Sequence, residues 1–215
     1  MTNEKMLEMV CKAEKELNEK SIYCSWIVEM KEALTDDIRA EEAKKRGCGN
    51  AQKIAEKVIK RGQTLRTSAI YPNSVYGAWL NNDGKQIITD SYLAARLSKM
   101  LPVTEATEDA TFPRVDGLIN AARRKNTLPL PLPTISELKA HIKTQKAERK
   151  GEKGYKPLWD FGRNLPQVVA EYLADAIELL GGIDVVAVCD EHCKNNAIYF
   201  SAAAGDGVLM PVRKA

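Results

Sequence analysis

The chain is poor in the residues that most catalytic and metal sites need. Its 215 residues include two histidines and five cysteines, and an odd number of irregularly spaced cysteines argues against a disulfide framework. No phosphate-binding loop, Gly-x-Ser-x-Gly or His-Glu-x-x-His motif occurs. Without a base–nucleophile pair, an enzyme is the class of protein that the sequence favours least. We expect neither catalysis nor a bound cofactor.

Long apolar runs and a strong net charge are also missing. No apolar stretch approaches the roughly 20 residues that span a bilayer, and the polar N-terminus Met-Thr-Asn-Glu-Lys is unlike a signal peptide. We therefore expect a cytoplasmic protein without a membrane partner. The net charge of +3 is too small to indicate nucleic acid by itself. Hydrophobic residues make up 44% and charged residues 28% of the chain, as in ordinary soluble globular proteins.

Two amphipathic helices are predicted at the N-terminus. Over residues 3–19, apolar side chains recur at helical spacing, at Met6, Met9, Val10, Ala13 and Leu17. The same spacing continues over residues 26–45, at Ile27, Met30, Leu34 and Ile38. Gly47 and Gly49 then end the second helix. We expect a helical N-terminal extension over residues 1–47, followed by one domain over residues 48–215.

The predicted domain begins with a helix and a strand meander. Asn50 can cap a helix that runs to Arg61. Short strand-like runs follow at residues 68–71, 76–80, 86–89 and 92–97. Between two of them, the Asn81-Asn82-Asp83-Gly84 cluster is a strong hairpin signal, because such residues tolerate positive φ angles.

An insertion is predicted over about residues 98–157. We expect a short helix over residues 115–123, and an extended Leu-Pro repeat over residues 128–133. A clear helix then starts after Thr134 and reaches about Glu148. Glu137 follows Thr134 by three residues, as a capping box requires. A basic, solvated linker ends the insertion.

A second helix-and-meander unit is predicted at the C-terminus. We expect a strand over residues 158–161, a helix over 169–180 and strands over 185–189, 197–201 and 208–212, with a hairpin turn at Gly205-Asp206-Gly207. Because proline cannot donate to a sheet ladder, Pro211 belongs at a sheet edge or just past one, which leaves Leu209, Met210 and Val212 at a sheet margin. The chain is thus predicted to be α+β, with an approximate internal duplication.

Four segments resemble the bacterial DNA sliding clamp, the β subunit of DNA polymerase III, and in particular short clamp-like proteins of phages and mobile elements. They are Gly84–Leu97 with its Thr-Asp step, Phe112-Pro-Arg-Val-Asp, the Tyr-Leu helix Ala170–Leu180, and the terminal Leu209–Arg213. The resemblance implies a DNA clamp-like domain of two helix-plus-antiparallel-strand units and a role as a DNA replication accessory protein. One such domain per chain means that any ring would need a homo-oligomer.

In the clamp family, partner proteins insert a short peptide into an apolar cleft between the Thr-Asp-Gly strand pair and the Met-Pro terminus. By position, the resemblance implicates Thr89, Ser91, Tyr92, Leu93, Ala94, Val208, Met210, Pro211, Val212 and Arg213. Ser91 stands where the family has Gly, and Leu93 where it has Arg. The expected partners are replication proteins that carry clamp-binding peptides. The alternative is that these residues only close the edge of the sheet.

Basic residues at helical spacing make double-stranded DNA a second candidate partner. Phosphate contacts without base reading suit a protein that slides, and the candidates are Lys53, Lys57, Lys60, Arg61, Arg123, Arg124, Lys139, Lys143, Lys146 and Lys150. Against this, the last helix carries Glu171, Asp175 and Glu178 on what we expect to be its outer face. An acidic wall would repel DNA, and favours a protein–protein modulator that uses the clamp fold without touching DNA.

Cys189, His192 and Cys193 form a small cluster in a predicted turn. Structural zinc needs four ligands, and a fourth would have to come from Cys11, Cys24 or Cys48. An incidental turn is the simpler interpretation, and we predict no metal site.

Overall fold

The protein has a mixed α+β fold. The structure, a computed structural model, describes residues 2–20, 24–45, 49–67, 75–103, 115–150, 152, 154–162, 164–182 and 184–212, apart from the side chains of residues 32, 36, 39–45 and 49. In chain order the elements are α1 (Asn3–Glu19), α2 (Ser25–Lys45), α3 (Gly49–Arg66), β1 (Gly77–Leu80), β2 (Gln86–Thr89), β3 (Leu93–Leu97), α4 (Val115–Lys125), β4 (Leu128–Leu130), α5 (Ile135–Glu148), β5 (Leu158–Asp160), β6 (Gln167–Val169), α6 (Ala170–Leu179), β7 (Val186–Cys189), β8 (Ile198–Ala202) and β9 (Gly205–Leu209).

One antiparallel sheet of seven strands joins the two halves of the chain. Its strand order is β1-β2-β3-β9-β8-β7-β4. The junction is the β3–β9 pair, in which Leu93 lies opposite Leu209 and Leu97 opposite Gly205. Strands β5 and β6 form a separate two-stranded sheet. A one-residue shift of β9 against β3 would turn the side chains of β9 to the opposite face of the sheet. The β3–β9 register therefore determines which side chains of β9 reach each face.

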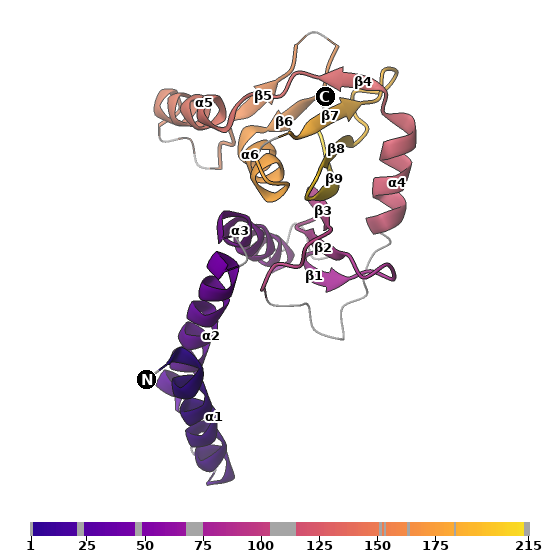
Figure 1. Ribbon diagram of the computed structural model, residues 1–215. Coiled ribbons are helices and arrows are strands. Elements are labelled where there is room, and N and C mark those ends of the chain that lie inside the picture. Colours follow the sequence, from indigo (N-terminus) through magenta and orange to yellow (C-terminus); the bar gives the residue numbers. More distant parts are fainter. Residues whose placement is uncertain are drawn as a thin grey trace.

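Helices cover both faces of the seven-stranded sheet (Figure 1). Helices α3 and α6 pack on one face, over side chains such as Ile88, Leu93, Phe200 and Leu209. Helix α4 packs on the other face, over a smaller cluster that includes Ile87 and Tyr199. The alternation follows from the period of two along each strand.

The two predicted units share one hydrophobic interior. A single cluster contains Val58 of α3 and Ile88 of β2 together with Leu173 of α6 and Phe200 of β8. Helices α3 and α6 lie against each other over this cluster. The two halves therefore form one body.

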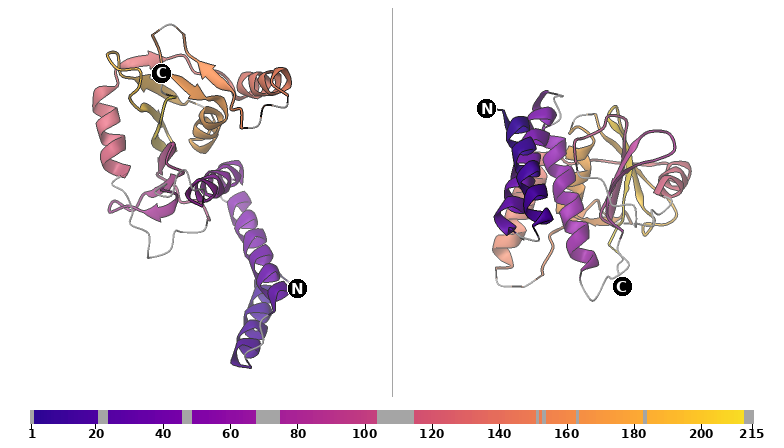
Figure 2. Two further views of the ribbon diagram at one scale, coloured as in Figure 1. Left: turned by 180° about the vertical axis from the view of Figure 1, so that it is seen from behind. Right: turned by 90° about the horizontal axis from the view of Figure 1, so that it is seen from below.

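Helices α1 and α2 form an antiparallel hairpin that projects from this body, and we call it the arm (Figures 1 and 2). The Lys31 ammonium of α2 pairs with the Glu14 carboxylate of α1 at 2.6 Å. No residue of α1 is buried, whereas Ile27 of α2 is 3% exposed. The arm therefore has almost no interior among the described residues.

Local sequence signals predict most element boundaries well. The capping box at Thr134 and Glu137 is formed. The hairpin at Asn81–Gly84 is also formed, with Gly84 at a φ of 72°. Helix α3 runs five residues beyond the predicted end at Arg61, to Arg66, and the strand predicted at residues 68–71 lies outside the described residues.

The C-terminal strand is displaced from its predicted position. Strand β9 spans Gly205–Leu209 instead of residues 208–212, and the turn lies at residues 203–204. Leu209 is fully buried inside the sheet, so the prediction of a sheet margin is wrong for this residue. Pro211 does lie just past the strand end, as expected. Strand β6 is not predicted, because the sequence analysis assigns Val169 to the following helix.

Within the described residues, none of the helices combines the length and the apolar character that a bilayer crossing requires.

Candidate functional site

An apolar cavity of about 330 Å³ opens beside the end of the β3–β9 pair, and we call it the β3–β9 pocket. It is lined by Val75, Thr89, Ser91, Tyr92, Leu93, Ala94, Val115, Leu118, Val208 and Met210. Most of the residues predicted for the peptide cleft are therefore neighbours around one hollow, although they come from segments more than 100 residues apart. All of the lining side chains are uncharged.

The other predicted cleft residues do not line this pocket. Pro211 and Val212 follow β9, and the Val212 backbone N–H donates to the Gln167 carbonyl at 2.7 Å. Val212 also packs against the large core on the α3–α6 face. Arg213 lies outside the described residues.

The turn between β2 and β3 forms one wall of the pocket, and Asp90 holds it. One carboxylate oxygen of Asp90 accepts hydrogen bonds from the backbone N–H groups of Tyr92, at 2.9 Å, and Leu93, at 2.7 Å. The Thr89 hydroxyl donates to the Leu93 carbonyl at 2.7 Å. These bonds close the turn from within and constrain its backbone.

Ser91 occupies the strained position of this turn. Its φ of 78° is a conformation that glycine favours. The Ser91 hydroxyl donates to the Val75 carbonyl at 2.7 Å and accepts from the Val75 N–H at 2.6 Å. These two bonds offset the strain and bring Val75 to the pocket.

Helix α4 supplies the opposite wall, through Val115 and the half-exposed Leu118. Arg96 of β3 anchors this helix, since its guanidinium pairs with Asp116 of α4 at 2.9 Å and with Asp206 of β9 at 2.6 Å. The hydrogen bond to Asp206 raises the pKa of Arg96 and outweighs the effect of burial. Sequence reasoning misses the α4 wall because it assigns this helix to an insertion and gives it no part in the cleft.

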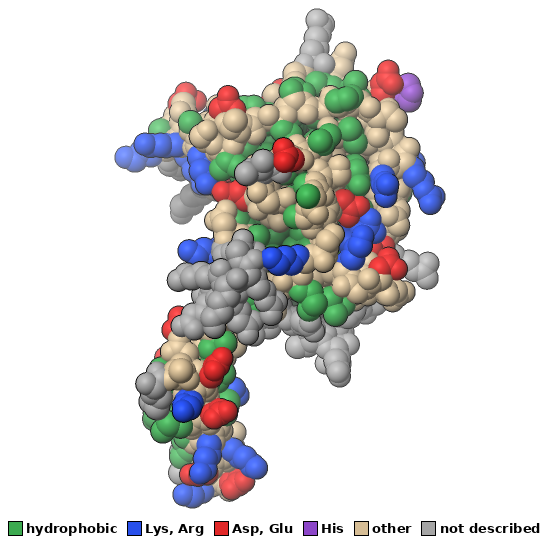
Figure 3. Space-filling view, in the orientation of Figure 1, with side chains coloured by type: hydrophobic (Ala, Val, Ile, Leu, Met, Phe, Trp, Pro, Cys, Tyr) green, Lys and Arg blue, Asp and Glu red, His purple; other side chains and the backbone are tan. Residues whose placement is uncertain are grey.

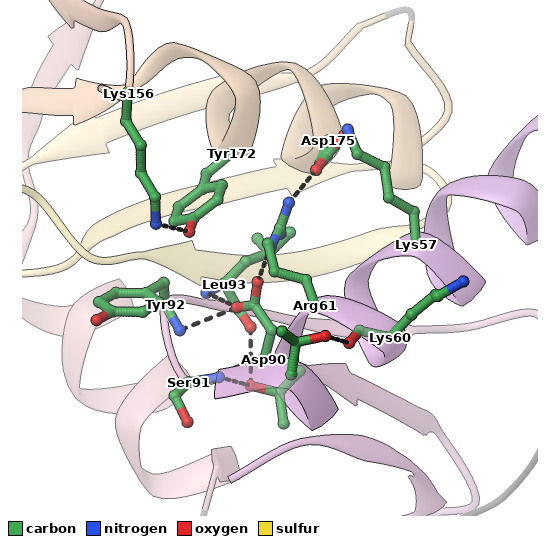
Figure 4. A network of polar contacts seen from close by, with 12 residues as sticks. Lys57, Lys60, Arg61, Asp90, Ser91, Tyr92, Leu93, Lys156, Tyr172 and Asp175 are labelled. Carbon is green, nitrogen blue, oxygen red and sulfur yellow. Dashed lines mark hydrogen bonds and ion pairs between the residues drawn. The ribbon is translucent and has the colours of Figure 1, made fainter. Parts of the chain in front are cut away.

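A buried ion-pair cluster lies behind the pocket, and we call it the Arg61 cluster (Figure 4). The Arg61 guanidinium of α3 donates both to Asp90 and to Asp175 of α6. The Lys57 ammonium donates to the second oxygen of Asp175 at 2.7 Å. The side chains of Asp90 and Asp175 are 0% and 1% exposed. Burial by itself lowers the pKa of Arg61, but the two carboxylates outweigh it and raise that pKa above its ordinary value.

The acidic face of α6 is covered, which corrects the prediction that it faces outward. Besides Asp175, Glu178 pairs with Lys139 at 2.9 Å and Glu171 pairs with Lys146 at 2.5 Å. Both lysines belong to α5, so α6 lies between the basic sides of α3 and α5. Burial is the largest single influence on the pKa of Glu171 and raises it. The hydrogen bond and charge of Lys146, together with the charges of Lys57 and Arg61, outweigh burial and leave the pKa below its usual 4.5.

The basic residues predicted for DNA fall into separate groups. Arg61 is directed into the protein, and Lys57, Lys139 and Lys146 pair with α6. Lys53 and Lys60 are exposed on α3, Lys143 is exposed on α5, and Lys150 is exposed just after α5. Arg123 and Arg124 are exposed on α4, across the sheet. Figure 3 shows basic side chains on both sides of the body with mostly uncharged surface between them. The ten residues do not share one surface.

The Cys-Asp-Glu-His-Cys segment forms a turn held by Asp190. The Asp190 carboxylate accepts from the backbone N–H groups of His192 and Cys193 and from the Asn196 side-chain amide. Cys189 is buried in β7, while His192 is exposed. No cluster of three or more His, Cys, Asp or Glu able to hold a metal is found within the part of the chain that the structure describes.

No protein-family model matches this chain, and neither a curated protein nor a solved structure matches it.

Proposed function

We propose that this chain is a clamp-like DNA replication accessory protein whose β3–β9 pocket binds a short apolar peptide of replication proteins. The observation that carries the proposal is the convergence of the Thr89–Ala94 segment with Val208 and Met210 around one apolar hollow. Methionine suits such a surface because its unbranched side chain adapts to varied partners. A volume of about 330 Å³ suits one or two apolar side chains of a peptide better than a large ligand.

The arrangement of the body supports the clamp-like part of this proposal. Each half consists of a helix followed by a three-stranded meander, α3-β1-β2-β3 and α6-β7-β8-β9. The two helices lie side by side on one face of the sheet, and the meanders meet at the β3–β9 pair. This is the pattern of paired helix-plus-strand units that the sequence resemblance implies.

Titration with a fluorescently labelled clamp-binding peptide tests the pocket. We expect saturable binding, and Met210→Ala should weaken it about tenfold by removing apolar contact area. Leu80→Ala is the matched control, because Leu80 is exposed on β1 and does not line the pocket. Absence of binding up to about 100 µM, or equal affinity of the Met210→Ala protein, would contradict the proposal.

A protein–protein modulator that never contacts DNA is the second candidate function. The observation that favours it is the pairing of Lys57, Arg61, Lys139 and Lys146 with the acids of α6, which neutralises four of the ten basic residues predicted to contact DNA. Salt-dependent DNA binding distinguishes the two. A clamp-like DNA contact should weaken steeply with added salt and on replacing Lys53 and Lys60 with Gln. A modulator should show no such binding while still binding the peptide.

A further inference from the structure

A lysine lies just outside the Tyr92 wall of the β3–β9 pocket, whose own lining is uncharged. Lys156 is exposed two residues before β5, and its ammonium lies 5.9 Å from the centre of the Tyr92 ring. The Tyr92 ring in turn packs against that of Tyr172 on α6, with the ring centres 5.7 Å apart. An aromatic pair therefore connects the apolar pocket to a positive charge.

The Lys156 ammonium donates to a neutral oxygen rather than to a carboxylate. Its hydrogen bond with the Tyr172 hydroxyl is 2.7 Å long, and it lies 5.1 Å from the centre of that ring (Figure 4). Among the residues that the structure describes, no carboxylate lies within ion-pair distance of Lys156. An ammonium has three N–H donors, so two of them can still bind an anion.

The Tyr172 hydroxyl offers another donor at the same place. Tyr172 is 3% exposed, and its oxygen already accepts from Lys156. A phenol also carries one hydrogen of its own, which donates to no acceptor in the described part of the chain. An ammonium and a hydroxyl that point to one place form charge-assisted hydrogen bonds with a carboxylate.

The neighbouring Arg61 cluster adds no net charge to this place. Arg61 and Lys57 carry its two positive charges. Both are paired, because Arg61 binds Asp90 and Asp175, and Lys57 binds the other oxygen of Asp175. Lys156 therefore stands as an unbalanced positive charge beside the pocket, and attracts an anion from outside the protein.

We propose that Lys156 and Tyr172 bind the carboxylate of an aspartate or glutamate in the same peptide whose apolar side chain fills the β3–β9 pocket. This inference rests on the proposed function, and it adds that the partner peptide carries an acidic residue close to its apolar one. Successive residues of an extended peptide rise by about 3.3 Å. The 5.9 Å between the Lys156 ammonium and the Tyr92 ring therefore places the acid one or two residues from the apolar side chain.

Two fluorescently labelled peptides of equal length test this preference. Both carry the same apolar residue, and the two positions before it and the two after it are Asp in one peptide and Asn in the other. At low salt, the wild-type protein should bind the Asp peptide about three- to fivefold more tightly, as expected for an exposed ion pair of good geometry. Added salt should reduce the difference by screening. Equal affinities would overturn the inference and leave the proposed function standing, whereas no binding of either peptide would overturn both.

Substitutions show whether Lys156 itself carries the preference. Lys156→Gln should lower the affinity for the Asp peptide to that for the Asn peptide, and Lys156→Glu should reverse the order. Tyr172→Phe keeps the ring and should reduce the preference in part. Lys85→Gln is the control, because it removes the same charge from an exposed position at the end of β2 away from the pocket, and should keep the wild-type preference. A preference that survives Lys156→Gln, or falls equally in Lys85→Gln, would overturn the inference.

Discussion

Arg61 is the residue on which the interior of the body most depends. It neutralises Asp90, which holds the pocket turn, and Asp175, which lies in the centre of α6. Its guanidinium also stacks on the Tyr172 ring at 4.0 Å. The side chain thus links α3, the β2–β3 turn and α6 through a contact that charge spacing along a single helix cannot reveal.

Arg61→Ala should therefore be strongly destabilising. Removing the guanidinium leaves Asp90 without a partner cation and Asp175 with only half-exposed Lys57. We expect the free energy of unfolding to fall by about 3–5 kcal/mol, as when one member of a buried ion pair is removed. Urea denaturation measures this loss. Lys60→Ala, at an exposed position of the same helix, should change the free energy by less than about 0.5 kcal/mol. Similar losses in the two variants would show that the Arg61 cluster is not needed.

At the scale of elements, strand β9 depends on how closely the backbones of β3 and β9 approach. A Cβ at Gly207 would lie 2.5 Å from the Ala94 carbonyl oxygen and 3.2 Å from the Ala95 Cα. Gly205 and Gly207, which the sequence predicts to lie in a hairpin turn, are instead strand residues of β9. Without side chains they permit the close approach of the two backbones. Their role depends on a partner strand more than 100 residues away.

Gly207→Ala should accordingly force β3 and β9 apart. We expect the free energy of unfolding to fall by about 1–3 kcal/mol, the usual cost of overpacking. Thermal or urea unfolding followed by circular dichroism measures it. Gly117→Ala, at an exposed position in α4, makes the same chemical change but should stabilise the helix by about 0.5–1 kcal/mol. A stability gain in both variants would contradict the close approach at Gly207.

For the whole molecule, the shared interior implies that the two halves unfold together. Ile88 of β2 and Leu173 of α6 belong to one cluster, so damage to the first half should reach the second. The arm, by contrast, contributes little to this interior among the described residues.

A single fluorescent probe can test this coupling. In a protein whose only tryptophan is Trp159, in β5, the fluorescence reports the second half. Ile88→Ala lies in the first half, yet it should lower the stability seen by Trp159 by about 2–5 kcal/mol. Leu80→Ala, on the exposed end of β1, should leave the urea midpoint nearly unchanged. If Ile88→Ala leaves the urea midpoint of the Trp159 fluorescence transition unchanged, the two halves unfold independently.

Local interactions determined what could be predicted from the sequence alone. The stripe of α1, the Thr134–Glu137 capping box and the Asn81–Gly84 hairpin depend on residues within a few positions of one another, and their elements form as expected. The α+β composition follows from these elements. The resemblance to clamp proteins indicated the Thr89–Ala94 and Val208–Met210 segments, which the structure brings together around one pocket.

Only the tertiary structure decided which charges meet and which strands are central. Arg61 and Asp175 are 114 positions apart, and no periodicity in either helix shows that α6 lies between the basic sides of α3 and α5. Likewise, β9 becomes a central strand because β3 pairs with one of its edges and β8 with the other. Pairing across the chain depends on the packing of the whole body, and a sequence pattern records only the neighbours along the chain.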